Sequence, residues 1–151
     1  MAETFTPQDP GFSERISQTF SNQGIMRTLG IKLGTVDPGR VQLELPIREE
    51  LCQQNGYLHA GVVTTMLDTA GGLAALTLMP VGAAVLAIEF KANFMAPAKG
   101  ETLVVHGRVV RAGKTITVCS ADAYATTRGK EKHVSTMIST VMTVVDRGTK
   151  D

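Results

Sequence analysis

The chain has 151 residues, of which 43% are hydrophobic, and this is enough for one domain with a sizeable core. Its formal net charge of +1 gives no reason to expect a nucleic acid or an anionic membrane as a partner. The two cysteines have no metal-ligand spacing, and residues 1–10 show no signal peptide. We therefore expect a reducing, cytoplasmic location.

The first part of the chain predicts an arm, a helix and a hairpin. Residues 1–11 contain prolines and no apolar period, so we expect a flexible N-terminal arm, followed by a single domain over residues 12–147. Ser13 can cap a helix over residues 14–28, in which Gly24 is a weak point. Two short strands follow, over residues 31–36 and 41–46. The Pro-Gly turn between them is typical of a hairpin.

Residues 60–79 predict one long helix at the centre of the fold. Positions 62–79 hold no Lys, Arg, Glu or Pro, and they show almost no polar face, so the helix should be covered on most sides. The segment approaches the length of a membrane span. Asp68 and two adjacent glycines make it a poor one, and we expect no membrane association.

The rest of the chain predicts strands, over residues 84–95, 101–111, 115–127 and 131–145. Short Gly-containing links join them, so neighbouring strands must be antiparallel. The sum is an α+β fold with an antiparallel sheet of five to six strands curled around the central helix. We also expect Met66, Met79 and Met95 to pack in the core, and His106 and His133 to lie on the surface or in satisfied positions.

Two stretches of the sequence resemble a known family. These are the pattern Gln53-x-x-Gly56-x-x-His59-Ala60-Gly61 with Asp68 nine positions after the histidine, and residues 89–100. Together they resemble the hotdog-fold acyl-CoA thioesterases of the phenylacetic-acid-degradation (PaaI-like) family, over roughly residues 25–145. The family commonly has Gly where Ala60 stands and Asn where Gln53 stands, and some members carry an assisting serine where Ala87 stands.

The resemblance implies a homodimer with active sites at its interface, and commonly a homotetramer that is a dimer of dimers. It also implies hydrolysis of an acyl-CoA, with the coenzyme as part of the substrate. No separate cofactor and no metal are predicted. The pantetheine arm would lie along the dimer groove, with the nucleotide near the surface.

Thioester hydrolysis requires a carboxylate, donors for the carbonyl oxygen and an apolar slot. Asp68 is the only acid between Glu50 and Glu89, and its charge in an apolar helix is costly unless it is paired or functional. The helix start at Ala60 and Gly61 offers free backbone N–H groups. A lone buried Asp is also often paired with an Arg or capped by threonine hydroxyls, so this structural alternative stays open.

A single chain cannot bring both the Asp68 carboxylate and the Ala60 amide to one substrate. Ala60 and Asp68 are eight residues apart, hence ~12 Å along a helix that rises ~1.5 Å per residue. A second, antiparallel copy of the helix would bring Asp68 of one subunit to the Ala60 amide of the other. Small residues three, four or seven positions from Asp68 should share its face and leave room for a partner or ligand: Thr64, Thr65, Gly71, Gly72 and Ala75.

We expect the following roles. Asp68 is the general base or the nucleophile, the amides of Ala60 and Gly61 polarise the carbonyl, Gln53 positions water or substrate, and His59 orders the start of the helix. The acyl group would be small to medium-sized, and an aromatic one fits. The substrate-binding candidates are Asn55, Thr64, Thr65, Gly72, Lys91, Asn93 and Lys99.

Two alternatives to hydrolysis remain at this point. The first is a 3-hydroxyacyl-thioester dehydratase, in which His59 and Asp68 would exchange a proton with the acyl carbons. The second is a non-catalytic acyl-CoA-binding module, which could dispense with Asp68. The hydrolase pattern fits the residue spacing better than the dehydratase pattern does.

Overall fold

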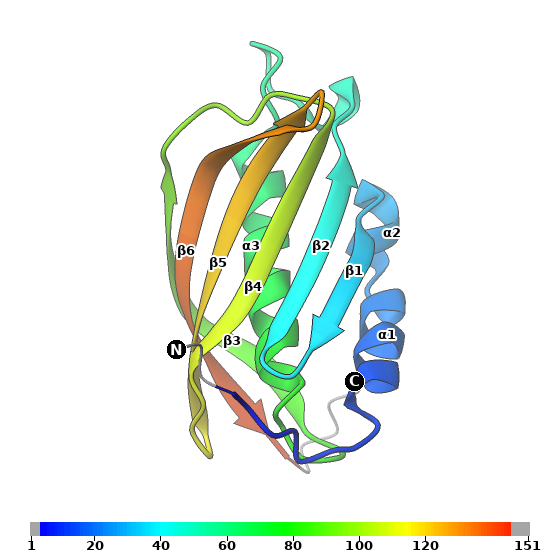
Figure 1. Cartoon of the computed structure of the whole chain (residues 1–151), viewed down its shortest axis with the longest axis vertical. Helices are drawn as coiled ribbons and strands as arrows, with labels where there is room; N and C mark the ends of the chain where they lie inside the picture. Colours follow the sequence, from blue (N-terminus) through cyan, green and yellow to red (C-terminus); the bar gives the residue numbers. More distant parts are fainter. Residues whose placement is uncertain (1–3, 146–151) are drawn as a thin grey trace.

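A six-stranded antiparallel sheet curls around one long helix, α3 (Ala60–Leu76), in the computed structural model, which describes residues 4–145 (Figure 1). The strand order is β1-β2-β4-β5-β6-β3. All neighbouring strands pair antiparallel, as the short links predict. The strands are β1 (Lys32–Asp37), β2 (Arg40–Pro46), β3 (Ala84–Phe94), β4 (Thr102–Arg111), β5 (Ile116–Thr127) and β6 (Lys130–Val144).

The predicted first helix is two helices, α1 (Phe12–Asn22) and α2 (Gly24–Leu29), with a short 3-10 turn, η1 (Glu49–Leu51), later in the chain. Gln23 breaks the helix in an extended conformation, next to the expected weak point at Gly24. Ser13 is not the N-cap, because the helix already begins at Phe12. The Asp9 carboxylate accepts a hydrogen bond from the Gly11 amide at 2.8 Å and shapes the chain before α1.

The described part of the expected flexible arm contacts the body of the fold. Gln8 donates a hydrogen bond to the Leu78 carbonyl at 3.0 Å, and Asp9 is 8% exposed. Phe5 packs against the core. Residues 1–3, and the predicted domain end at 146–147, lie outside the described residues.

The interface between α3 and the sheet contains a backbone-to-backbone contact. A Cβ atom placed on Gly107 of β4 would lie 2.3 Å from the main chain of Ala70 in α3. Only glycine allows so close an approach. Met66, Leu67 and Leu73 of α3 are almost completely buried, so the prediction of a covered central helix is confirmed. The helix ends at Leu76 and not at residue 79, and Leu78 and Met79 stay buried beyond it.

Strand β3 forms one edge of the sheet and carries apolar side chains that nothing in residues 4–145 covers. Ile88, Phe90 and Phe94 are about half exposed, at 53%, 45% and 51%. Met95, which directly follows the strand, is 52% exposed, so its predicted place in the core is wrong. It lies where the chain leaves the open edge. Met66 and Met79 do pack in the core.

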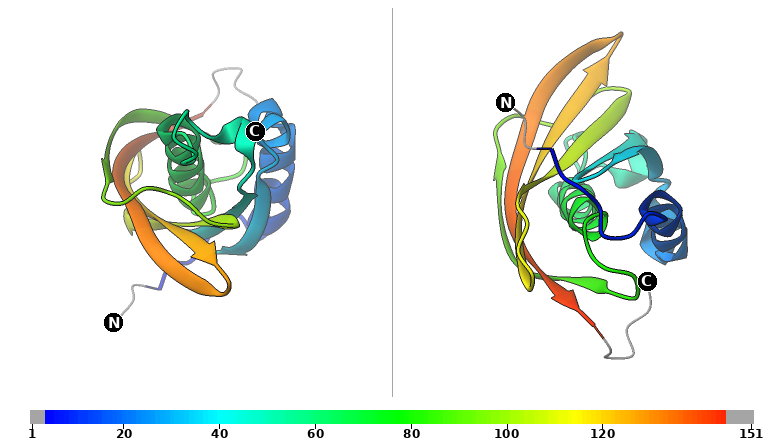
Figure 2. Two further views of the ribbon diagram at one scale, coloured as in Figure 1. Left: turned by 90° about the horizontal axis from the view of Figure 1, so that it is seen from above. Right: turned by 60° about the horizontal axis from the view of Figure 1, so that its bottom comes forward.

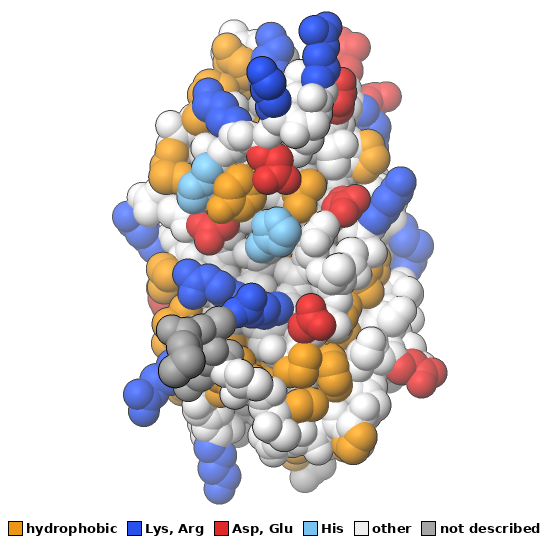
Figure 3. All heavy atoms as spheres, viewed as in Figure 1, with side chains coloured by type: hydrophobic (Ala, Val, Ile, Leu, Met, Phe, Trp, Pro, Cys, Tyr) orange, Lys and Arg blue, Asp and Glu red, His pale blue; other side chains and the backbone are white. Residues whose placement is uncertain are grey.

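The outer face of the sheet, which Figure 3 views, mixes acidic, basic and apolar side chains without a large field of one sign. His133 pairs with Asp122 at 3.1 Å and stacks on Tyr124, whose ring centroid is 4.7 Å away. His106 is exposed and contacts the edge of the same tyrosine. Both histidines are therefore surface residues, as predicted. Within residues 4–145, every helix is too short or too polar to cross a bilayer.

Candidate active site

Asp68 opens into a cleft between α1, α3 and β3, with a volume of about 640 Å³, here called the Asp68 cleft. α1 lies beside the lower part of α3 in Figure 1, and Figure 2 shows it on the side of α3 away from the wrapped sheet. The apolar part of the cleft comes from α3, β3 and β6. Its lining includes Leu73, Leu76, Ala84, Val85, Ala87 and Val141.

The Asp68 carboxylate has no ion pair within the described residues. The structural alternative of an arginine partner is thereby excluded for residues 4–145. Burial raises the pKa of Asp68 above its ordinary value of 3.8, and no neighbouring cation counteracts this. A half-buried acid with a raised pKa, open to a cleft and without a partner, is typical of a functional carboxylate.

A second cleft, of about 370 Å³, lies at the start of α3 and contains Ala60 and Gln53; it is here called the Ala60 cleft. Tyr57 of the preceding turn and Val63 of α3 line it on the same side. The other walls come from the end of β3 and the chain after it, and from β6, and they include Phe94, Met95, Ala96 and Ser135. The structure thus brings Gln53 and Ala60 together, as the sequence predicts, but in a different cleft from Asp68.

The start of α3 leaves one of the two predicted amides free. His59 is the N-cap residue, and its Nδ1 accepts a hydrogen bond from the Gly61 amide at 2.9 Å. The Ala60 amide has no such partner among the backbone and side-chain hydrogen bonds of residues 4–145. Ala60 is therefore the available donor for a carbonyl oxygen, and His59 orders the helix start as expected.

Gln53 begins a tight turn that the positive φ of Gly56, 79°, makes possible. Its side-chain oxygen accepts a hydrogen bond from the Asn55 amide. This fixes the orientation of the side-chain amide and leaves its NH₂ group to donate. Asn55 itself is exposed in the turn, outside the lining of both clefts.

The small residues on α3 divide into two groups. Thr64, Thr65 and Gly72 are half-buried, and the Thr65 hydroxyl donates to the Gly61 carbonyl at 2.9 Å. Gly72 lines the Asp68 cleft, as predicted. Gly71 and Ala75 are instead buried, so the prediction that they leave room for a partner is wrong. A Cβ on Gly71 would lie 3.3 Å from the Ser139 hydroxyl.

Apart from Gly72, the predicted substrate-binding residues lie outside the lining of both clefts, and three of them are on β3 or in the loop after it. Lys91 and Asn93 are exposed on β3 and hydrogen-bond each other at 2.7 Å. Lys99 is exposed in the loop that follows the strand. Two cationic side chains near the open edge of the sheet suit a phosphate-bearing group at the surface.

The sequence did not indicate the contribution of α1. Thr19, Asn22 and Gln23 line the Asp68 cleft from the α1 side. Tyr57 and Ser135 in the Ala60 cleft were missed as well. The apolar period of α1 predicts a packed helix, but no local signal says which of its polar residues faces α3.

The comparisons with known proteins agree with this architecture. The family model of the thioesterase superfamily matches residues 55–132, which include Ala60, Asp68 and Lys91. Human acyl-coenzyme A thioesterase 13 is 34% identical over 106 residues, covering 69% of this chain and 75% of the relative.

Solved structures show the same fold. A thioesterase family protein from Silicibacter pomeroyi superposes with a TM-score of 0.88 at 45% identity, covering 89% of this chain and 99% of that one. The PaaI protein of the Escherichia coli phenylacetic acid degradation operon superposes with a TM-score of 0.81 at 18% identity, covering 91% and 96%. At that identity the likeness shows the fold alone.

A six-stranded antiparallel sheet wrapped around one helix, together with these matches, defines a hotdog-fold thioester hydrolase. This chain belongs to the thioesterase superfamily. The predicted fold class, the resemblance to PaaI-like proteins and the hydrolase class are confirmed.

Proposed function

We propose that the protein hydrolyses a small to medium acyl-CoA, aliphatic or aromatic, to the free acid and CoA. The unpartnered carboxylate of Asp68 in an apolar cleft carries this proposal. The acyl-coenzyme A substrate of the human relative, which is 34% identical, supports the choice of thioester. The apolar residues behind Asp68 supply a slot for the acyl group.

The residues support either of two balanced routes. In the first, Asp68 takes a proton from water as the water oxygen bonds to the carbonyl carbon. In the second, the Asp68 carboxylate bonds to that carbon, loss of the thiolate gives an anhydride, and water then hydrolyses the anhydride. In both routes the Ala60 amide stabilises the developing oxyanion, and collapse of this oxyanion breaks the C–S bond to release the thiolate. Gln53, through its free NH₂ group, orients the water or the substrate.

A homodimer completes the site. The Asp68 cleft borders β3 at Ala84–Ala87, and the Ala60 cleft borders it at Phe94. If two β3 edges pair antiparallel about a twofold axis near Phe90 and Lys91, residues 84–87 of one strand lie beside the Phe94 end of the other. The two clefts then merge across the interface. The exposed apolar side chains of β3 support this pairing, because association would remove them from water.

The coenzyme would leave this merged cleft at the surface. Lys91, Asn93 and Lys99 lie along the open edge and are our candidates for its phosphates, with Asn55 at the turn nearby. Thr64 and Thr65 would line the groove between the two helices. Ala87 lines the Asp68 cleft without a hydroxyl, so it cannot assist a water molecule there. Assembly of two dimers into a tetramer, and a cytoplasmic location, stay predictions.

Complementation between two inactive variants tests the shared site. Asp68→Asn and Gln53→Ala are each purified, their loss of thiol release from a panel of acyl-CoAs is measured, and they are then mixed under exchange conditions. Random exchange gives half heterodimers, each with one intact site of two, so about a quarter of wild-type activity should return. Two copies of the same variant, mixed in the same way, are the control.

The outcome distinguishes the proposal from its rivals. No recovery, with heterodimers demonstrated by mass spectrometry, rejects a site built from two subunits. Tight binding of acyl-CoA by the wild type without thiol release indicates a non-catalytic module. An enoyl chromophore without thiol release indicates a dehydratase. No contact in the described residues favours either rival over hydrolysis.

A further inference from the structure

We infer that α1 is the specificity-determining wall of the acyl slot, and that a buried clamp between Asp9 and Arg15 holds this wall in place. The inference rests on the proposed hydrolysis of an acyl-CoA and adds the element that selects the acyl group. Thr19, Asn22 and Gln23 form the α1 side of the Asp68 cleft.

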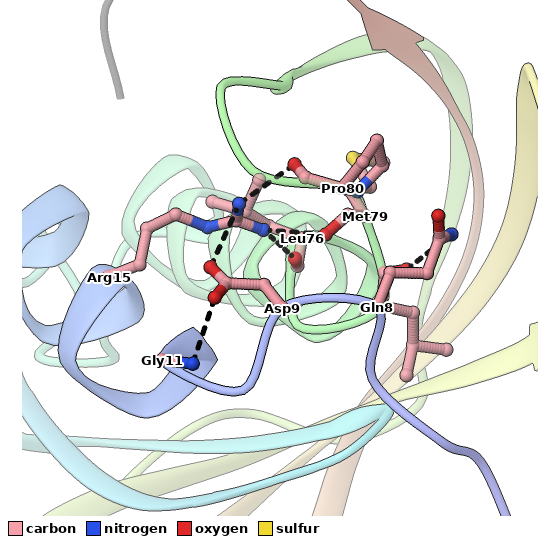
Figure 4. Close-up of polar contacts among 8 residues, drawn as sticks. Gln8, Asp9, Gly11, Arg15, Leu76, Met79 and Pro80 are labelled. Atoms are coloured by element: carbon pink, nitrogen blue, oxygen red, sulfur yellow. Dashed lines mark hydrogen bonds and ion pairs between the residues drawn. The ribbon is translucent and has the colours of Figure 1, made fainter.

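The clamp joins α1 to the far end of α3 (Figure 4). The Arg15 guanidinium donates hydrogen bonds to the carbonyls of Leu76 at 2.8 Å, Met79 at 2.9 Å and Pro80 at 2.8 Å. The Asp9 carboxylate lies 3.2 Å from the same guanidinium, and both side chains are about nine-tenths buried. Carbonyls at a helix end carry partial negative charge, so a buried cation there is well placed.

The clamp lies outside the Asp68 cleft, so it acts on the slot through the position of α1. Ile16, one residue after Arg15, is fully buried in the core and anchors the same turn of the helix. Thr19 follows one turn later and faces the cleft. Arg15 and Asp9 are therefore positioning residues, and Thr19 is a contact residue of the wall.

The opposite wall contains an open position. A Cβ atom placed on Gly72 of α3 would meet nothing within 4 Å, so the space beside it belongs to the cleft. The Thr19 hydroxyl is buried and has no hydrogen-bond partner within residues 4–145, so its removal breaks no bond there. A larger residue at Gly72 of α3 can thus narrow the slot, and a smaller one at Thr19 of α1 can widen it. Neither change disturbs a contact that the fold needs.

The proposed α1 wall and the groups proposed for the chemistry occupy different parts of the chain. The thioesterase family match begins at residue 55, after α1, and contains both Ala60 and Asp68. A wall outside the matched region can change without touching the groups that act on the carbonyl. This separation is what a specificity element requires.

The first test changes the two walls in opposite directions. kcat and KM are measured for straight-chain acyl-CoAs from butyryl to lauroyl, with thiol release as the readout. Gly72→Ala should lower kcat/KM for lauroyl relative to butyryl by about 10-fold, and Thr19→Ala should raise that ratio by about 10-fold, the lower end of the range for a methyl-sized change in an apolar pocket. Ser17→Ala, on the exposed side of α1, is the matched control and should leave the ratio unchanged.

The second test loosens the clamp. Asp9→Asn and Arg15→Lys should both flatten the chain-length profile, mainly through KM, and speed hydrogen exchange in α1. Asp9→Asn keeps the side-chain shape, so it serves if Arg15→Lys does not fold. A purely structural clamp would lower Tm and leave the chain-length profile unchanged, which overturns the inference for Asp9 and Arg15.

The proposed function and the role of α1 can fail separately. If the wild type hydrolyses acyl-CoAs through Asp68 but Thr19→Ala keeps the wild-type ratio, only the role of α1 is overturned, whatever the result for Gly72→Ala. If no acyl-CoA is hydrolysed, the proposed function fails and the role of α1 in selecting acyl groups fails with it.

Discussion

Asp68 combines a stability cost with a proposed chemical role. Because burial raises its pKa, the native state keeps the Asp68 proton to a higher pH than the unfolded chain does. The resulting stabilisation is fully present below the unfolded value of 3.8, and it is lost as the pH rises through the native pKa. At neutral pH the ionised carboxylate therefore destabilises the fold.

Asp68→Asn should consequently raise Tm at pH 7 while it lowers kcat by about 10²- to 10⁴-fold, the usual range for a lost acid–base group. The gain in Tm should shrink as the pH approaches 3.8 and the wild-type carboxyl becomes protonated. Thermal unfolding across this pH range checks the change in Tm, and kinetics at pH 7 check the change in kcat. A variant that is less stable at pH 7 would show that Asp68 has a stabilising partner.

The two thiols should differ sharply in reactivity. Burial raises the pKa of Cys119 to about 12, so its reactive thiolate is almost absent near neutral pH. Cys52 is half-buried and donates its S–H to the Arg48 carbonyl at 3.4 Å. A thiol reagent should therefore modify one cysteine in the native protein and two after unfolding. Cys52→Ser should abolish the native reaction, whereas Cys119→Ser should preserve it.

The capping residue at the start of α3 permits a prediction at the scale of the element. His59→Ala removes the acceptor for the Gly61 amide and should destabilise the protein by about 0.5–2 kcal/mol. His59→Asn should restore most of this stability, because its side-chain oxygen can accept the same bond. Denaturant unfolding measures both variants. An equal loss of stability in His59→Ala and His59→Asn would show that the imidazole acts through another contact.

The contact between α3 and β4 predicts a contrast between two glycines. Gly107→Ala would force a methyl group against the backbone of Ala70 and should destabilise the protein by about 3 kcal/mol or more. Gly72→Ala meets open space inside a helix and should stabilise it by up to about 1 kcal/mol. Urea unfolding of both variants tests the contrast. A tolerated alanine at Gly107 would contradict the close approach.

Sequence patterns predicted the elements well wherever burial is periodic or uniform. The apolar run after Gly61 predicted α3, and the alternation in residues 101–111 predicted a strand with one buried face. The break at Gln23 and the direction of Gly71 were not predictable in this way. Helical spacing places residues 68, 71, 72 and 75 on one broad face, and only contacts with the sheet, such as the approach of Cys119 and Ser139 to Gly71, decide which half of that face is buried.

At the scale of the whole molecule, the open edge of β3 predicts a dimer that is required for activity. Phe90→Glu should place a charge at the centre of the paired edges, give a monomer mass and lower activity by at least about 100-fold, since neither cleft is complete alone. Ile25→Glu in α2, a position of similar exposure, should stay dimeric and active. Light scattering with size-exclusion chromatography measures the mass of both variants, and circular dichroism checks that both are folded. An active Phe90→Glu monomer would contradict the shared site.

The glycine contact that seats α3 on the sheet also limits how substrate range can diversify on this scaffold. A helix locked main chain to main chain cannot slide or tilt to admit a longer tail. New selectivity must then arise at the N-terminal helices or at the joint with the second subunit. Directed evolution of this enzyme should accordingly collect its gains there and leave Gly107 and its neighbours in place.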